Sequence, residues 1–213
     1  MAVRHSKRFA PGWVVAVLLC VTLTAAAASL RAAFSVPLAV SSGQVSIAGT
    51  SNIHAYTAST TDVRVVRVRL AEGLAGPNFW NDLVKPGAVE AFEIAIPAAK
   101  LSSPREGLDK NMHKALKVTE HPDITFRLLR LEEKAGMPGT LRAQGVLKIA
   151  GVERQVSFDV TTRQNESTLT VKGEMPLLMT DYGITPPKAM LGMLKTDPKV
   201  TVSFETVLAI PLT

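Results

Sequence analysis

The sequence contains little cysteine, few aromatic residues and a modest number of charges. Of its 213 residues one is cysteine, 5% are aromatic and 20% are charged, whereas 46% are hydrophobic. A single cysteine excludes an intramolecular disulfide framework, so stability must come from burial and strand pairing. The scarcity of aromatic residues argues against a base-stacking nucleic-acid platform, and the hydrophobic share argues against a disordered tail. A chain of this length is expected to form one domain with a real core.

The motifs of the common catalytic sites are also missing. The chain has no GxSxG, HExxH, Walker A or GxGxxG pattern, so no nucleophile–base pair, zinc site or phosphate loop can be identified. His54, His113 and His121 fall in a predicted strand, a predicted helix and a turn before a proline. Their spacing does not require a metal. We therefore expect no catalytic residues, no metal and no cofactor.

The N-terminus has the organisation of a secretory signal peptide. A basic start (Arg4, Lys7 and Arg8) precedes an apolar run, Trp13 to Thr24, and then small residues that end at Ala28. Cleavage after Ala28 removes the only cysteine and three of the 24 basic residues, which leaves 21 against 18 acidic residues. The resulting net charge of about +3 gives little support to a nucleic-acid partner. We predict a periplasmic or secreted protein.

The same segment is compatible with other fates. Pro11 to Leu30 approaches the length of a membrane span, so an uncleaved anchor is the alternative. Cleavage after Ala33 is a weaker option because Arg31 then occupies the −3 position. Lipidation at Cys20 is rejected because Leu19 stands where a small residue is needed. The predicted organisation is a signal peptide at 1–28, a lead-in at 29–43 and one domain at 44–213.

Past the leader, apolar and polar residues alternate as in antiparallel strands with one buried face. Residues 141–149 alternate in this way, Ala150-Gly151 supplies a tight turn, and the pattern resumes from Val152 to Val160, which predicts a β-hairpin. The last strand, Val200 to Ile210, is the longest. Sequential strands separated by short turns predict an antiparallel barrel or sandwich. The inner face is also expected to include Val66, Val68 and Leu70.

Two short helices are predicted to cover the end of this barrel. The first, over 104–117, begins with a capping box of Ser103 and Glu106, and its apolar stripe is Leu108, Met112, Ala115 and Leu116. The second, over 187–194, carries Met190, Leu191 and Leu194 at helical spacing. A barrel plugged by its own side chains needs no such covers, and one of about eight strands is wide enough to hold one small ligand.

Several short motifs follow one another in a characteristic order. They are Gly49-Thr50-Ser51-Asn52-Ile53-His54, Ile96-Pro97, Gly107-Leu108-Asp109 with Met112 and Leu116, His121-Pro122-Asp123-Ile124-Thr125-Phe126, Gly145-Val146-Leu147, Thr180-Asp181-Tyr182-Gly183-Ile184 with Pro187, and Asp197 with Val200 to Phe204. In this order, from Val45 to Ile210, they resemble the YceI-like family of exported proteins. The resemblance implies an extended, lipocalin-like antiparallel barrel whose apolar cavity holds an isoprenoid-type lipid, without catalytic residues. One departure is Tyr56, where many relatives carry tryptophan.

The expected function is therefore that of an exported lipid-binding protein with a carrier, storage or stress role. Its partners would be a hydrophobic lipid and, transiently, a membrane, with no nucleic acid. His54 and Tyr56 share a strand face and are candidate contacts for a polar head group, although an outward orientation is the simpler interpretation. The expected cavity residues are Phe92, Ile94, Met112, Leu116, Phe126, Leu128, Phe158, Met179, Met190, Leu191 and Phe204.

Two alternatives come from other classes of protein. A hydrolase of lipids or esters would have to use His54, His121 or Asp123, although no nucleophile–base arrangement is legible. A ligand-free structural or stress module would have a barrel that is packed solid. The presence of a bound lipid in the purified protein separates the carrier from both.

Overall fold

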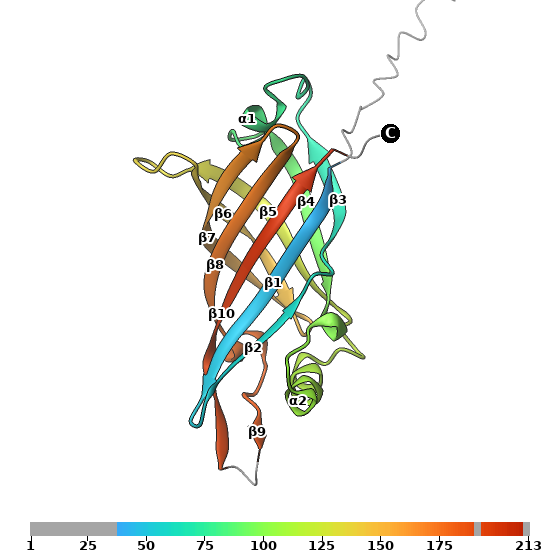
Figure 1. The fold of residues 1–213 in the computed structure, drawn as a ribbon, viewed down its shortest axis with the longest axis vertical. Helices are drawn as coiled ribbons and strands as arrows, with labels where there is room; N and C mark the ends of the chain where they lie inside the picture. The colour runs from blue at the N-terminus through green and yellow to red at the C-terminus, as the bar shows by residue number, and fades with distance from the viewer. Residues whose placement is uncertain (1–37, 190–192, 211–213) are drawn as a thin grey trace, which may run out of the picture. The chain divides into compact units, whose positions relative to one another are not determined.

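The computed structural model describes residues 38–189 and 193–210, and these form an almost entirely antiparallel β structure (Figure 1). The helices of this part are α1 (Phe79–Leu83) and α2 (Glu106–Leu116), with 3₁₀ turns η1 (Ala98–Lys100) and η2 (Met179–Tyr182). None of them is long and apolar enough to span a membrane. The strands are β1 (Ala39–Ser51), β2 (Ala55–Thr60), β3 (Arg64–Leu70), β4 (Val89–Pro97), β5 (Asp123–Glu133), β6 (Thr140–Ile149), β7 (Val152–Asn165), β8 (Thr168–Leu178), β9 (Lys188–Ala189) and β10 (Leu194–Ala209).

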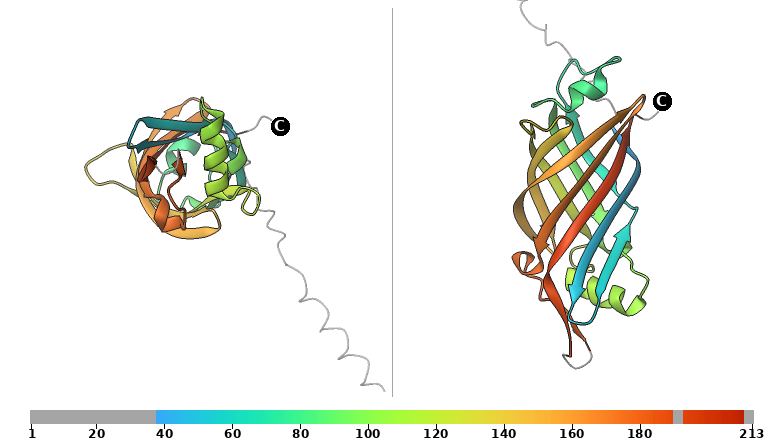
Figure 2. Two further views of the ribbon diagram at one scale, coloured as in Figure 1. Left: turned by 90° about the horizontal axis from the view of Figure 1, so that it is seen from below. Right: turned by 60° about the vertical axis from the view of Figure 1, so that its left-hand side comes forward.

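One sheet contains nearly all of these strands, in the order β2-β1-β10-β8-β7-β6-β5-β4-β3. The sheet curls into a ring, which is seen from one end in Figure 2. Its two edges, β2 and β3, are consecutive in the chain. Beside this seam Ser59 and Ser102 exchange backbone hydrogen bonds of 2.8 and 3.0 Å. The predicted single antiparallel barrel is confirmed.

The first strand begins earlier than the predicted domain. β1 starts at Ala39, which pairs with Ala209 of β10, and the pairing continues to Ser51 opposite Thr196. Residues 39–43 are the last part of the predicted lead-in at 29–43, and they form the first backbone pairs between β1 and β10. Leu38, next to them, is 6% exposed and packs in the core.

The predicted hairpin of β6 and β7 is confirmed, and its turn explains a histidine. Ile149 pairs with Val152, while Ala150 and Gly151 have φ of 48° and 83°, the two positive values of a type I′ turn. A Cβ at Gly151 would lie 2.5 Å from Nε2 of His121. The His121 ring therefore packs on this turn, which agrees with a structural role for it.

The inward orientation predicted for Val66 is wrong. The register of β3 against β4 shifts between Val65 and Arg67, so Val66 has no cross-strand partner. Such a bulge inserts one residue and ends the simple alternation of faces. Val66 is 55% exposed, whereas Val68 and Leu70 stay half-buried.

The first predicted helix is confirmed as α2, but its start differs. The N-cap is Arg105, which makes no side-chain cap bond. The Ser103 hydroxyl instead accepts the Arg105 N–H and donates to the Arg105 carbonyl, while Asp109 accepts the Ser103 N–H at 2.8 Å. The predicted capping box of Ser103 and Glu106 is therefore not formed, because Ser103 closes a local turn before the helix begins.

The second predicted helix is wrong where the structure describes it. Ala189 and Lys188 of β9 pair antiparallel with Leu194 and Lys195 of β10. Residues 190–192, with Met190 and Leu191, lie outside the described residues. A short apolar run fits helix and strand periodicity equally well, and pairing with the long β10 decided between them.

Substitution of the turn glycine should destabilise the fold. Gly151→Ala places a side chain at positive φ and against the His121 ring, so we expect the free energy of unfolding to fall by about 1–3 kcal/mol. Gly107→Ala is the control, because nothing lies within 4 Å of its added Cβ and α2 should gain about 0.5–1 kcal/mol. Urea denaturation measures both, and a Gly151→Ala variant as stable as the parent would contradict this account.

Candidate functional site

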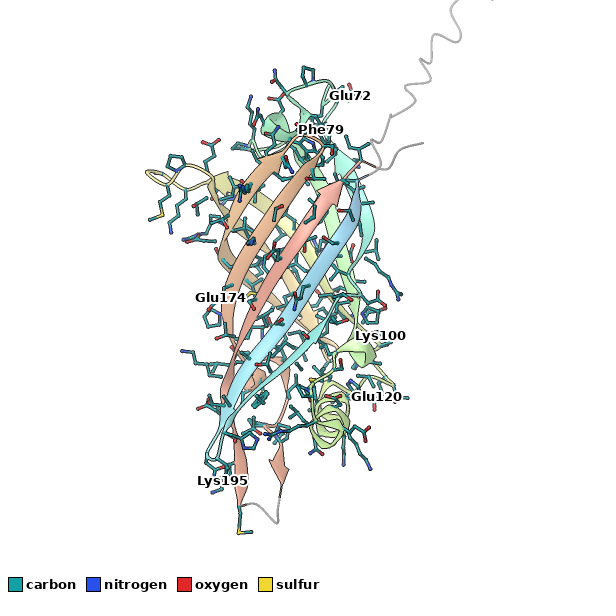
Figure 3. The ribbon with its side chains drawn as sticks, in the orientation of Figure 1. Glu72, Phe79, Lys100, Glu120, Glu174 and Lys195 are labelled. Atoms are coloured by element: carbon teal, nitrogen blue, oxygen red, sulfur yellow. The ribbon has the colours of Figure 1, made fainter. Side chains whose placement is uncertain are left out.

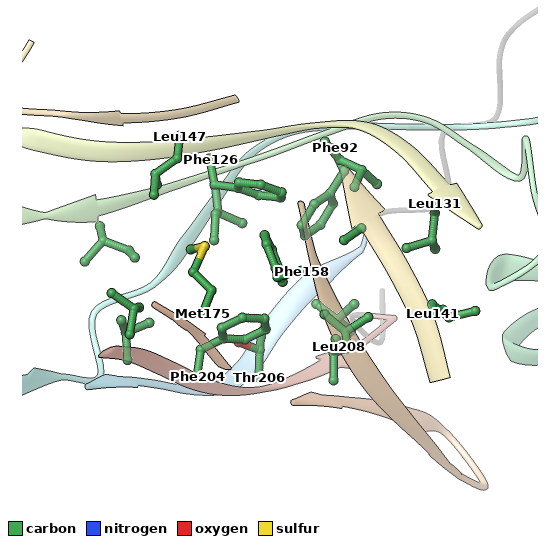
Figure 4. Close-up of a pocket in the computed structure, with 18 of the residues that line it drawn as sticks. Phe92, Phe126, Leu131, Leu141, Leu147, Phe158, Met175, Phe204, Thr206 and Leu208 are labelled. Carbon is green, nitrogen blue, oxygen red and sulfur yellow. The ribbon is translucent and has the colours of Figure 1, made fainter. Parts of the chain in front are cut away.

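The interior of the barrel holds a cavity of about 200 Å³. A single water needs only about 10–15 Å³ by the same kind of measure, so the space is large for a packed core. Apart from Thr162 and Thr206, every side chain that lines it is apolar. Figure 4 shows Phe92, Phe126, Phe158 and Phe204 reaching toward one another from the surrounding strands. A cavity of this composition stays dry and favours an apolar occupant.

One end of the cavity is closed by α1. Phe79, Trp80 and Leu83 of this helix are 3–4% exposed and pack on Leu169 and Leu208. The Phe79 and Trp80 rings meet edge to face, with centroids 4.9 Å apart. Phe79 marks this end in Figure 3, and Lys195 marks the opposite end. Leu83 also lines the cavity, so α1 forms its floor.

A second cavity, of about 100 Å³, lies beneath α2 at the other end. Leu108, Met112 and Leu116 of α2 line it, which is the stripe predicted from helical spacing. Seen end-on in Figure 2, α2 lies across part of the ring. The two cavities share five lining residues and therefore lie next to each other; the shared residues are Ile47, Ile124, Ile149, Leu177 and Val202. We call the two cavities together the channel.

Glycines let aromatic rings lie directly against the wall of this channel. A Cβ added at Gly145 would lie 2.4 Å from the Phe126 ring, and one at Gly173 would lie 2.5 Å from the Phe204 ring. Phe158 stands between these rings, with centroid distances of 5.5 Å to Phe126 and 5.8 Å to Phe204. The two glycines therefore accommodate the aromatic groups on neighbouring strands, an arrangement that sequence alternation alone does not reveal.

Most of the predicted cavity residues do line the channel. Six line the larger cavity and three the smaller, whereas Met190 and Leu191 lie outside the described residues. Sequence reasoning missed α1, whose five residues are too few for a periodic pattern. The available signal was an aromatic pair, Phe79-Trp80, in a loop rich in glycine and proline. The lining residues are Phe92, Ile94, Phe126, Leu128, Phe158 and Phe204, then Met112, Leu116 and Met179.

The two candidate head-group contacts have different surroundings. His54 does not line either cavity, and its Nε2 accepts a hydrogen bond from the Arg105 guanidinium. Tyr56 lines the smaller cavity, with its ring over Gly49. Tyr56 is therefore directed inward, contrary to the simpler outward interpretation.

Two buried hydroxyls in the smaller cavity lack partners. The chain has two tyrosines, Tyr56 and Tyr182, and neither hydroxyl has a hydrogen-bond partner in the described part of the chain. Burial raises the pKa of both, and the charge of Asp197 adds to the rise for Tyr56. Buried polar groups normally have partners, so these hydroxyls are donors available to a polar group within an apolar channel.

In the part of the chain that the structure describes, no acid–base or metal-binding cluster accompanies the channel. Among the described residues, no three His, Cys, Asp or Glu side chains are grouped as metal ligands, and no hydrogen bond joins His54, His121 and Asp123. Ion pairs lie on the outer wall, where Asp159 meets Lys134 and Arg142 and these cations lower its pKa to about 2. The site can hold an apolar molecule, which would be bound through the removal of its apolar surface from water.

Alkaline titration should detect the buried tyrosines. Folding raises both pKa values above 10.0, so the folded protein retains protons that the unfolded chain loses, and the free energy of unfolding should fall as pH rises past 10. Phenolate absorbance of native protein should therefore rise at higher pH than in denatured protein. Tyr56→Phe and Tyr182→Phe assign each step, and coincident native and denatured curves would refute the burial of these groups.

The comparisons with known proteins agree with this geometry. The family model of the YceI-like domain matches residues 42–208. No curated protein matches the chain. Among solved structures, Burkholderia cenocepacia BcnA has a TM-score of 0.61 at 15% identity, with 78% of this chain and 96% of that chain covered. A polyisoprenoid binding domain from Saccharophagus degradans, implicated in plant cell wall breakdown, has a TM-score of 0.59 at 11% identity, with 82% and 98% covered.

A third structure, the Campylobacter jejuni YceI protein, has a TM-score of 0.50 at 13% identity and covers 74% of this chain and 82% of its own. At such low identities the structures establish the fold alone. The family match extends over most of the chain and includes β1 from Ser42 through β10 to Leu208. This chain belongs to the YceI-like domain family.

Proposed function

We propose that the protein binds a long apolar lipid of isoprenoid type in the channel between α1 and α2. The observation that carries this proposal is the adjacency of the two cavities, whose shared lining residues are all apolar. An apolar chain moved there from water gains about 25 cal/mol for each Å² that it buries. The Saccharophagus degradans relative is described as a polyisoprenoid binding domain, and this favours an isoprenoid among apolar chains.

Different side chains would contact different parts of the bound lipid along the channel. Phe92, Phe126 and Phe158 would contact the middle of the bound chain with large apolar faces. Met112 and Met179 would adapt to it at the α2 end, because flexible thioethers fill irregular space. Binding rather than catalysis is the function that this set of residues can perform.

The proposed setting is the periplasm or the medium, after removal of residues 1–28. We propose a carrier or storage role for the lipid, or a role in stress, since these roles suit a protein that holds a lipid without transforming it. Loading and unloading would then require transient contact with a membrane. The basic start, apolar run and small residues before Ser29 support export.

Gently purified protein should carry a lipid. Native mass spectrometry should show a mass above that of the chain, and organic extraction should release an isoprenoid. The same lipid, or geranylgeraniol, added to delipidated protein should raise the melting temperature by mass action. Empty extracts, together with no binding and no thermal shift from added isoprenoids, would overturn the proposal.

Filling the channel should block binding without unfolding the barrel. Ala143 lines the larger cavity, and Ala143→Leu would occupy space that ligand methylene groups need, so geranylgeraniol should bind about tenfold more weakly. Ala91→Leu is the matched control, because Ala91 alternates with the inward Phe92 and does not line the channel. Fluorescence titration compares the two variants, and equal affinities would place the ligand elsewhere.

A further inference from the structure

The wall of the barrel is not hydrogen-bonded all the way between β7 and β8. The two strands pair from Asn165 opposite Thr168 as far as Val160 opposite Gly173, and there the ladder ends. Both strands continue: residues 152–159 of β7 pair only with β6, and residues 174–178 of β8 pair only with β10. Pro176, within the unpaired part of β8, has no N–H to donate to a ladder. We call this opening the β7–β8 split.

The split is hollow on the outside and borders the channel. A depression of about 610 Å³ lies there, lined from β7 by residues 154–157 and from β8 by residues 175–178. Met175 and Leu177 line both this depression and the larger cavity. The same two side chains therefore separate the outer surface from the apolar interior, and a chain passing between them would remain in apolar contact.

An arginine interrupts the apolar face of β7 at this split. Arg154 has the strand parity of Val156, Phe158 and Val160 and lies opposite Leu147, a residue that lines the cavity. At this inward position an apolar side chain is the normal choice in a barrel that holds an apolar core. Arg154 is exposed because the wall opens beside it.

The charges around the split favour an anion. Arg154 donates from Nη1 to the Glu153 carbonyl at 3.1 Å, and neither Arg154 nor Lys199 forms an ion pair within the described residues. Among the described residues of the lining Asp181 is the one acid, and Gln155 and Ser157 add neutral polar groups. The lining thus has two cations against one carboxylate.

Tyr182, whose hydroxyl is buried, lies between the split and the channel and lines both. Tyr182 is 3% exposed, lines both the split and the smaller cavity, and its hydroxyl has no partner among the described residues. Arg154 is near enough for its charge to oppose the rise in the pKa of Tyr182. The Tyr182 hydroxyl and the Arg154 guanidinium are therefore close to each other.

We propose that the β7–β8 split binds the anionic oxygen head group of the lipid, a phosphate or a carboxylate, through Arg154, Lys199 and the Tyr182 hydroxyl. The lipid chain then passes Met175 and Leu177 into the channel. A guanidinium and a phenol O–H are strong donors to such oxygens, and charge-assisted bonds to them exceed neutral ones in strength. This inference rests on the proposed function, because it requires a lipid chain in the channel.

Three ligands with one C20 chain test the head group: geranylgeranyl phosphate, geranylgeranoic acid and geranylgeraniol. In the wild-type protein one or both anions should bind more tightly than the alcohol, and which anion binds more tightly identifies the head group. Arg154→Gln should weaken anion binding about tenfold and leave the alcohol unchanged. Arg163→Gln is the control, because Arg163 is an exposed arginine of the same strand in its paired part, opposite Thr170.

Two tyrosine variants localise the head group. Tyr182→Phe should weaken anion binding by several-fold, whereas Tyr56→Phe should not, since both hydroxyls are buried and unpartnered but only Tyr182 lines the split. Circular dichroism and melting temperature verify the fold of each variant. Equal losses in the two variants, or no effect of Arg154→Gln, would overturn the head-group site while lipid binding stands. Failure of all three ligands to bind wild-type protein would instead overturn the proposed function.

Discussion

The pairing of β1 with β10 joins the two ends of the described chain and holds the barrel together. The ladder runs from Ala39 opposite Ala209 to Ser51 opposite Thr196. Every other neighbour relation on this path, apart from the pairing of β8 with β10, links strands that are consecutive in sequence. Because β2 and β3 do not pair in a ladder, the contact of β1 with β10 alone joins β1 and β2 to the rest of the curled sheet. Antiparallel closure satisfies the backbone groups of both strands and leaves one face of each strand directed inward. The apolar channel exists because this closure gathers those inward faces around one space.

Helical covers at both ends and glycines in the wall allow the channel to remain hollow. α1 and α2 cover the two ends, so the apolar interior is shielded without being filled from the strands. Along the wall, Gly145 and Gly173 accept the rings of Phe126 and Phe204. Native cores are normally packed without such voids, because unfilled space forfeits dispersion contacts. A space retained at that cost is consistent with a function that fills it with a ligand.

Polar groups are placed at the boundary between this interior and water. The ion pairs that cross between strands, such as Lys172 with Glu205, decorate the outside, where exposed pairs contribute little to stability. Tyr56 and Tyr182 place hydroxyls inside the α2 end, and Arg154 stands where the wall opens. The channel is thus chemically polarised, with an apolar end at α1 and its polar groups at the α2 end and the β7–β8 split.

Local patterns in the sequence were sufficient to predict the fold class, the hairpin of β6 and β7, helix α2 and most of the apolar lining. Those features depend on local periodicity and turn chemistry, and Phe126, Phe158 and Phe204 lay on inward faces that alternation identifies. Three features became visible only in the folded chain: the bulge that exposes Val66, the strand pairing of Lys188–Ala189 and the position of α1 at one end of the cavity. The same holds for the inward direction of Tyr56 and the split beside Arg154. Each of these depends on strand register or on packing between segments, and the periodicity of one stretch of sequence does not contain those contacts.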